Sequence, residues 1–499
     1  MCVPLAMILA LATTPAPVDA WLDDFFRPHA GRGIVAVAIV HDGQVTVRAY
    51  GAAPDSVFRM ASLSKVVTAY AAVQLAKEGR LDLHARIPGT PVTPHHLLTH
   101  TSGIEDAFFG NTVHVGRHIT LAEHFSENPP RFGRPPGREI VYSNEGIALL
   151  GRVIEQGCGL QFEQCVQRRV FGPLGMQRST FVQPPPFPVI PSGAEGQASV
   201  QAPAGAMVST AADMAKFLEA LLGAHQTDGL FRDDIGGHRA LFHTGRSGHE
   251  SVLYLVPQHH LGLFVVHTGG MDRALRKRFV TEAVRRLLPA QPGRLRTGRP
   301  GGLRSGIYRP ILFPRWRIEH AALLGADAML EVDGDRATLR MPPFAMGPKL
   351  EFASDGYAIT GGGDRVTVTG PLFEPVTFER IPWYASGRVQ LAAVAVAALA
   401  LVIVAIRRRG NALVVVALFA TAPLAIAAIY FPGDAEQRPF LVEPSLRVGL
   451  TFVMLACAAA LRLPLVAWRS RRADDAIGAA CAAGIIVFLW YWNLLGWRF

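Results

Sequence analysis

A serine and a lysine lie three residues apart in the segment Phe58-Arg-Met-Ala-Ser62-Leu-Ser-Lys65-Val-Val-Thr-Ala. On a helix this spacing brings both side chains onto one face. A serine hydroxyl is a poor nucleophile until a neighbouring base accepts its proton, and a lysine can accept it where burial or nearby cations lower the lysine pKa. Only five of the 49 basic residues are lysines, so a lysine here indicates a chemical requirement. The pair predicts nucleophilic catalysis, with Ser62 as nucleophile and Lys65 as its partner.

A second candidate motif places Tyr142 and Asn144 two residues apart in Val141-Tyr-Ser-Asn-Glu-Gly146. A tyrosine can act as a general base if nearby cations lower its pKa, and an asparagine amide can donate a hydrogen bond to a substrate carbonyl. Taken alone, this short pattern is equally typical of an ordinary turn.

The third motif is Phe242-His243-Thr244-Gly245-Arg246, at the end of a predicted strand. Gly245 would let a substrate backbone approach the strand edge closely. The N–H of the next residue could form half of an oxyanion hole, with the Ser62 N–H as the other half. A competing His-Thr-Gly match begins at His267, but only residues 243–245 precede a full predicted hairpin.

In this order, the three motifs resemble those of the class C β-lactamase and penicillin-binding-protein-like serine hydrolases, a family that includes D-Ala-D-Ala carboxypeptidases, D-aminopeptidases and esterases. Residues 97–104, 171–176 and 204–213 are similar to the family too. The resemblance covers residues 21–290. It implies an α/β (α+β) fold, with an antiparallel sheet flanked by helices, an all-helical lobe, and the site between them. It also implies an acylated Ser62, proton transfer by Lys65 and Tyr142, and substrate contacts from Asn144, His243, Thr244, Gly245 and Arg246.

Two residues depart from the family pattern. His243 stands where true β-lactamases often carry a lysine, and Arg246 stands where a small residue is common. The first departure favours a peptidase- or esterase-like enzyme over a dedicated β-lactamase. The Arg246 side chain could select anionic substrates or shield the site.

Short-range patterns predict the elements that position these residues. Residues 33–49 show the alternating, β-branched pattern of a strand on both sides of an Asp42-Gly43 pair. Such a pair is a strong hairpin signal. A helix is predicted over residues 65–77, a second hairpin over 251–267 and an amphipathic helix over 272–288. A helix that begins beside Ser62 would favour negative charge developing there.

Length and composition indicate several domains and a membrane region, since 50% of the 499 residues are hydrophobic. We expect a signal peptide over residues 1–20 and the hydrolase domain over 21–290. A linker rich in Gly, Pro and Arg follows over 291–309, then a small antiparallel β domain over 310–385 and a four-helix transmembrane region over 386–499.

Four apolar segments, at residues 389–406, 412–431, 447–468 and 477–496, each approach the length of a spanning helix. Arginine clusters separate the first from the second and the third from the fourth. The positive-inside rule places both clusters in the cytoplasm. The hydrolase domain is then expected on the periplasmic side of the inner membrane, as the signal peptide also requires.

Other classes of site are less well supported. The formal net charge is +10, but no basic stripe interleaves with aromatic residues, so nucleic-acid binding is not expected. His95, His96 and His100 lack an HExxH pattern, and neither a metal nor a cofactor is expected. Cys158 and Cys165 could pair or remain separate thiols, and the sequence leaves both open.

The sequence is compatible with three functions. The first is a membrane-anchored serine hydrolase that forms an acyl-enzyme with a D-amino-acid peptide, an ester or a β-lactam. The second is a non-catalytic envelope sensor or interaction protein, because four membrane segments are more than an anchor needs. The third, a transporter, is least supported, since the apolar segments contain almost no polar residue. The presence of both Ser62 and Lys65 favours the first.

Overall fold

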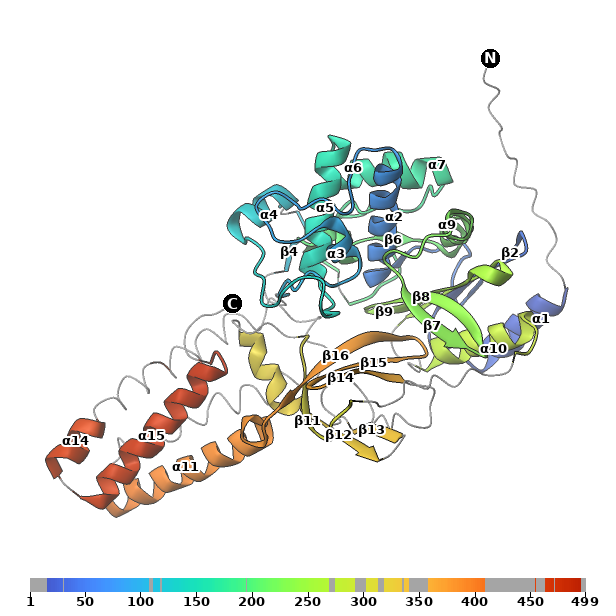
Figure 1. The fold of residues 1–499 in the computed structure, drawn as a ribbon. Coiled ribbons are helices and arrows are strands. Elements are labelled where there is room, and N and C mark those ends of the chain that lie inside the picture. The colour runs from blue at the N-terminus through green and yellow to red at the C-terminus, as the bar shows by residue number, and fades with distance from the viewer. Residues whose placement is uncertain are drawn as a thin grey trace. The chain divides into compact units, whose positions relative to one another are not determined.

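In the computed structural model (Figure 1), the chain forms two compact units. The first unit comprises Met1–Leu83, Leu150–Ala198 and Ala202–Arg294, and the second comprises His84–Leu149, Ser199–Gln201 and Leu295–Phe499. The residues that the structure describes are 16–29, 31–106, 111–116, 119–193, 195–268, 274–291, 302–312, 318–333, 336–340, 358–408, 454, 463–470 and 472–494.

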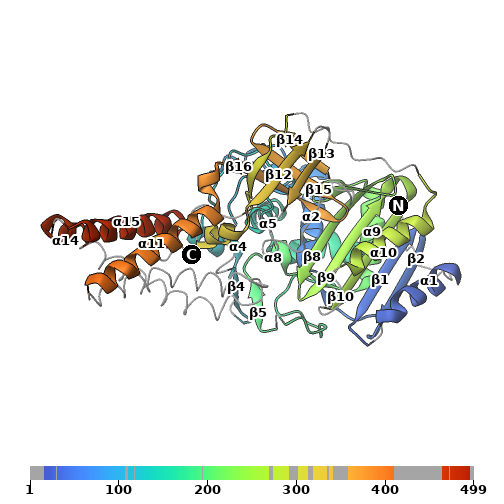
Figure 2. The same ribbon diagram turned by 90° about the horizontal axis from the view of Figure 1, so that it is seen from below.

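Six antiparallel strands form the central sheet of the first unit, in the order β2-β1-β10-β9-β8-β7. Figure 2 shows β8, β9, β10, β1 and β2 side by side. Their bounds are β1 (Val35–His41), β2 (Gln44–Tyr50), β7 (Phe231–Ile235), β8 (His238–Ser247), β9 (His249–Val256) and β10 (Leu261–Thr268). Both predicted hairpins are confirmed, as β1–β2 and β9–β10. At the β1–β2 turn, Asp42 and Gly43 have φ of 48° and 78°, the left-handed values that a two-residue hairpin turn requires. Every residue of β9 is buried, so both faces of the sheet are covered there.

Helices cover this sheet and carry the chain between its strands. Those of the first unit are α1 (Ala16–Phe26), α2 (Ser64–Lys77), α6 (Phe162–Val166), α7 (Gly172–Leu174), α8 (Ala202–Gly205), α9 (Ala211–Ala224) and α10 (Leu275–Leu287). The predicted helices over 65–77 and 272–288 are confirmed as α2 and α10. Gly262 of β10 lets α9 approach closely, because a Cβ there would lie 3.1 Å from the Leu218 Cβ. The Trp21 and Phe279 rings stack at 5.9 Å and join α1 to α10. Helix α1 runs through residue 20, the predicted end of the signal peptide, and Asp19 pairs with Arg48.

A disulfide joins Cys158 to Cys165, with the two Cα atoms 6.1 Å apart. The bond links the end of helix α5 (Asn144–Cys158) to α6, and both cysteines are buried. The structure thus decides in favour of pairing where the sequence left two possibilities open.

Replacing Cys158 and Cys165 together with alanine is expected to lower the free energy of unfolding by about 2 kcal/mol, because a short closed loop removes a modest amount of entropy from the unfolded chain. Urea unfolding of the purified chain measures the change. The matched control is Cys481→Ala, which removes a free cysteine. An equal midpoint for the double variant and this control would contradict the prediction.

The second unit contains a helical segment and a small β domain. The helical segment holds α3 (Pro94–Leu98), α4 (Leu121–Glu127) and the first turns of α5, and the short strands β4 (Thr112–His114) and β5 (Gln197–Ser199) lie outside both large sheets. The β domain is an antiparallel sheet in the order β13-β12-β11-β16-β15-β14. Its strands are β11 (Gly306–Pro310), β12 (Ala328–Asp333), β13 (Arg336–Arg340), β14 (Ala358–Gly362), β15 (Arg365–Gly370) and β16 (Phe373–Ile381).

This second sheet bears out the antiparallel β structure expected from the sequence. Tyr308, Leu330, Val368 and Phe378 lie in its hydrophobic core. The first strand begins at Gly306, so the sheet starts within residues 291–309, which the sequence suggested were a linker. The strand formed there because Ile307 and Tyr308 find partners on β12 and β16, which are distant in sequence.

Two of the described helices are long and apolar enough to cross a membrane, at Gly387–Val404 within α11 (Gly387–Arg408) and at Ala473–Tyr491, which is α15. They coincide with the first and fourth predicted segments. The second segment, 412–431, lies outside the described residues, and the third is described only at residue 454 and in α14 (Leu463–Ser470). Four spans therefore remain a prediction.

Candidate active site

Ser62 lies in the short helix η2 (Ala61–Leu63), directly before α2. The residue before it, Ala61, has φ of 48°, a left-handed conformation that residues with a Cβ rarely adopt. Ser64 holds this turn, because its Oγ donates to Ala61 O at 2.6 Å and accepts from Met207 N at 3.1 Å. Backbone strain of this kind persists where the surroundings enforce it, and it often marks a functional site.

Lys65 is the partner of Ser62 in the folded chain. Its Nζ donates to Ser62 Oγ at 3.0 Å and to Ala204 O at 2.7 Å, and the residue is 1% exposed. The hydrogen bond to Ala204 O therefore orients the Lys65 amine toward Ser62 Oγ. Once deprotonated, an amine in this position can accept the hydroxyl proton directly, which is the geometry of a nucleophile and its base.

Strand β8 lies against the segment that precedes Ser62. A Cβ at Gly245 would lie 2.4 Å from Met60 O and 2.5 Å from Ser251 Oγ, so only glycine permits this approach. Thr244 is half-buried and Arg246 is exposed, whereas His243 is fully buried, with its Nδ1 2.7 Å from Thr244 O. The third motif is thus brought beside Ser62.

Arg276, at the start of α10, holds the same part of β8. Its Nη1 donates to Ser251 O at 2.8 Å and to Gly245 O at 3.4 Å, and its Nη2 lies 2.9 Å from Glu250 Oε2. The arginine therefore joins β8 to β9 next to the glycine. Sequence reasoning missed Arg276, because one arginine in a basic helix carries no local signal.

Tyr142 belongs to the second unit, where its ring stacks on His100 with centroids 4.6 Å apart and planes inclined by 27°. The neighbouring Ser143 N donates to His100 Nδ1 at 3.2 Å, and Val141 N donates to His100 O at 2.7 Å. His100 itself has φ of 54°. One histidine therefore supports three consecutive residues of the motif.

Asp106 holds the other end of this motif. Its carboxylate accepts from Ser143 Oγ at 2.6 Å, Asn144 N at 2.7 Å and Glu145 N at 2.9 Å, and so caps the start of α5. Burial raises the pKa of Asp106 to about 6, although these three donors act in the opposite direction. Asp106 has no sequence spacing that could have predicted it, since it lies 38 residues before Asn144.

Replacing Asp106 with asparagine is expected to change how stability depends on pH. A carboxyl whose pKa is raised in the folded state contributes stability below its unfolded value of 3.8, and this contribution is lost as the pH rises through about 6. The wild type should therefore lose about 2 kcal/mol relative to the variant between about pH 4 and pH 7. Urea unfolding at both pH values measures the difference, with Asp42→Asn in the exposed β1–β2 turn as control. A difference that does not change with pH would contradict the prediction.

A buried polar cluster lies behind the motif, in the second unit. Glu145 accepts a hydrogen bond from Gln201 Nε2, and its two carboxylate oxygens lie 3.0 and 3.1 Å from His124 Nε2. All three residues are buried, so the cluster stiffens the first turn of α5.

The three histidines considered as metal ligands have other contacts. His96 Nδ1 accepts from Thr93 N at 3.2 Å in a capping box, and the His95 ring contacts His84. His100 supports the tyrosine motif. Among the described residues, no group of three His, Cys, Asp or Glu side chains is arranged to hold a metal ion.

The structure thus joins Ser62, Lys65 and residues 243–246 within one unit. Tyr142 and Asn144 are held in the other unit by contacts of their own, and their approach to Ser62 remains a prediction of the family resemblance.

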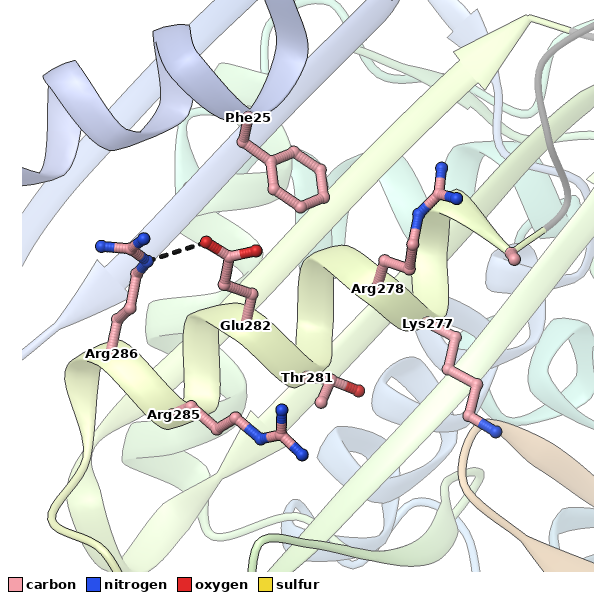
Figure 3. A pocket seen from close by; sticks show the side chains of 8 residues that line it. Phe25, Lys277, Arg278, Thr281, Glu282, Arg285 and Arg286 are labelled. Carbon is pink, nitrogen blue, oxygen red and sulfur yellow. Dashed lines mark hydrogen bonds and ion pairs between the residues drawn. The ribbon is translucent and has the colours of Figure 1, made fainter. Parts of the chain in front are cut away.

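An open groove of about 620 Å³ lies between α1 and α10 in the first unit (Figure 3). None of the residues of the three motifs lines this groove. It is basic, and Arg286 Nε pairs with Glu282 at 2.8 Å. Its lining residues are Phe25, Ala274, Lys277, Arg278, Thr281, Glu282, Arg285 and Arg286.

The family pattern described as Beta-lactamase matches residues 22–235, which include Ser62, Lys65 and Tyr142 and end before β8. The chain is 35% identical over 140 residues to Penicillin-binding protein 4 of Amycolatopsis lactamdurans, which covers 25% of this chain and 36% of that protein. It is 28% identical over 193 residues to the D-alanyl-D-alanine-carboxypeptidase/endopeptidase AmpH of Escherichia coli K12, covering 34% and 50%. It is 29% identical over 218 residues to Esterase EstB of Burkholderia gladioli, covering 37% and 55%.

The chain spans about half or less of the length of these three relatives. The first two motifs fall inside the matched region and have the geometry described above. Residues 22–235 of the chain are therefore similar to the β-lactamase family of penicillin-binding-protein-like serine hydrolases.

Proposed function

We propose that the chain is a membrane-anchored serine hydrolase that acts through an acyl-enzyme on the outer side of the inner membrane. The observation that carries this proposal is the 3.0 Å hydrogen bond between buried Lys65 Nζ and Ser62 Oγ. A buried lysine is costly to a fold, so its presence beside a serine argues for a chemical role.

In the proposed reaction, the Lys65 amine accepts the Ser62 proton as Oγ attacks the substrate carbonyl carbon. The N–H groups of Ser62 and Arg246 donate to the oxyanion that forms. The leaving group departs with a proton returned through Lys65 and Tyr142, which leaves an ester on Ser62. Water then attacks this ester, and its proton returns to the enzyme as the acid product and free Ser62 are released.

The substrate is proposed to be a D-amino-acid peptide or an ester, and a β-lactam is a less suitable substrate. His243 is fully buried and replaces the lysine that β-lactamases often present from this strand. Two similar proteins are described as a D-alanyl-D-alanine-carboxypeptidase/endopeptidase and as an esterase, which agrees with this choice. Asn144 and Thr244 are the proposed contacts to the substrate backbone, and exposed Arg246 could favour a negatively charged substrate.

Membrane anchoring is proposed from the apolar helices α11 and α15. The arginine cluster at residues 407–409 begins within the last turn of α11, so by the positive-inside rule we expect the hydrolase domain on the opposite, extracytoplasmic side. The second candidate function is an envelope sensor that no longer turns over substrate. It is favoured by the presence of more than one apolar helix, because one would suffice as a tether.

Intact-mass analysis of the purified chain after incubation with D-Ala-D-Ala peptides, short esters, β-lactams and a fluorophosphonate tests the proposal. We expect a mass increase equal to the acyl or phosphonyl group, located on Ser62 by peptide mapping and lost in Ser62→Ala. If no probe modifies the wild type, the sensor function is favoured. If Ser62→Ala is modified equally, the assignment of the nucleophile is wrong.

A further inference from the structure

Four charged residues join the β domain to the loop before Tyr142, all within the second unit. From the loop come Arg134 and Glu139, and from the β domain come Arg365 and Glu379, which face each other across β15 and β16. Arg134 Nη1 lies 3.3 Å from Glu379 Oε2 and 3.9 Å from Glu139 Oε2. Arg365 pairs with Glu139 and lies 4.0 Å from Glu379 Oε2. We call these four residues the ion-pair network.

The loop half of the network is buried, whereas the β-domain half is partly exposed. The Glu139 and Arg134 side chains are 6% and 9% exposed, compared with 45% for Arg365 and 26% for Glu379. A buried carboxylate needs more than one partner to offset the loss of its hydration. The β domain supplies the additional partners, so the buried pair depends on strands that lie more than 200 residues further along the chain.

Glu139 lies three residues before Tyr142, on a stretch fixed at several points. Gly137 N donates to Thr101 O at 2.7 Å, and Val141 N donates to His100 O at 2.7 Å. His100 in turn stacks on Tyr142. A displacement of Glu139 would therefore also displace Tyr142 and the His100 ring that stacks on it.

The β domain is also bonded to the first residue of helix α11. Arg309 of β11 pairs with Asp327 at 2.8 Å, and Asp327 Oδ2 accepts from Gly387 N at 2.7 Å, at the first residue of helix α11. The same sheet thus contacts the start of an apolar helix at one place and the tyrosine loop at another.

We propose that the β domain positions the tyrosine loop for catalysis, with Arg365 and Glu379 as positioning residues that act through Glu139 and Arg134. This role rests on the proposed function, in which Tyr142 transfers a proton. The β domain would then contribute to catalysis, although it contains none of the residues of the three motifs.

The test uses the full-length chain in detergent micelles and the variant Arg365→Glu, which places a like charge beside Glu139. Hydrogen exchange of the peptide covering residues 134–142 should become faster. The kcat for a short ester should fall about 10- to 100-fold, because small displacements of a reacting group are costly, with little change in KM. The conservative variant Arg365→Lys keeps a positive charge beside both Glu139 and Glu379 and should retain most of the kcat and the exchange protection.

The matched control is Arg340→Glu, which reverses an arginine of the same β domain whose partner, Glu331, also lies there. It should leave kcat and loop exchange unchanged. Unaltered loop exchange in Arg365→Glu would overturn the inference, whether or not the wild type is active. A loss of kcat in Arg365→Lys as large as the loss in Arg365→Glu would overturn it too, because the positive charge is kept. Failure of the proposed function would look different, since the wild-type chain itself would then show no turnover.

Discussion

Replacing Lys65 with methionine is expected to lower kcat/KM for acylation of Ser62 by about 10²- to 10⁴-fold, the usual contribution of a general base. Methionine keeps a long apolar side chain but removes the amine that hydrogen-bonds Ser62 Oγ and Ala204 O. Lys65→Arg should be similarly impaired, because a guanidinium group stays protonated and cannot accept the serine proton. The second-order rate of fluorophosphonate labelling measures the effect.

The matched control for this prediction is Lys77→Met, at the exposed last turn of the same helix α2. It removes the same amine where no reacting group lies, and its labelling rate should equal that of the wild type. A Lys65→Met variant that labels within a factor of about two of the control would show that a base other than Lys65 activates Ser62.

Replacing Gly245 with alanine is expected to reduce the labelling rate by about 100-fold or more, since the added Cβ meets backbone and cannot be accommodated by a side-chain rotation. It would lie 2.4 Å from Met60 O, two residues before Ser62. Either β8 or the turn that carries Ser62 must move. We also expect a loss of about 1–3 kcal/mol in the free energy of unfolding, as for other overpacked sites.

Labelling kinetics and urea unfolding of the same preparation measure these two effects. The control is Gly223→Ala in helix α9, where a Cβ would meet nothing within 4 Å and the backbone is helical. That variant should label normally and be equally or slightly more stable, because alanine favours a helix more than glycine does. Normal labelling of Gly245→Ala would show that β8 does not form a wall of the site.

Local patterns predicted the elements of the first unit well. The Asp42-Gly43 turn, the β9–β10 hairpin and helices α2 and α10 all depend on contacts or conformations within a few residues, which a linear pattern can carry. The same holds for Ser62 and Lys65, since helical geometry alone brings residues at this spacing together.

Groups distant in sequence could not be predicted in this way. Ala204 O aims Lys65, Asp106 caps the Asn144 turn, and Arg276 joins β8 to β9, yet none has a recognisable motif. Folding buries backbone groups and charged side chains, and each of these needs a hydrogen-bond partner. The three groups supply such partners from distant segments of the chain.

By itself, the sequence determined the order of the three motifs, the family that they resemble, and the antiparallel character of both sheets, because these follow from residue type and short spacing. Only the tertiary structure decided that Cys158 and Cys165 pair and that β8 packs closely against Met60 at Gly245. It alone also joined the β domain to the loop of Tyr142 through Glu139. The physical reason is that these contacts depend on where separate elements pack, and packing follows from the burial of the whole chain rather than from any one segment.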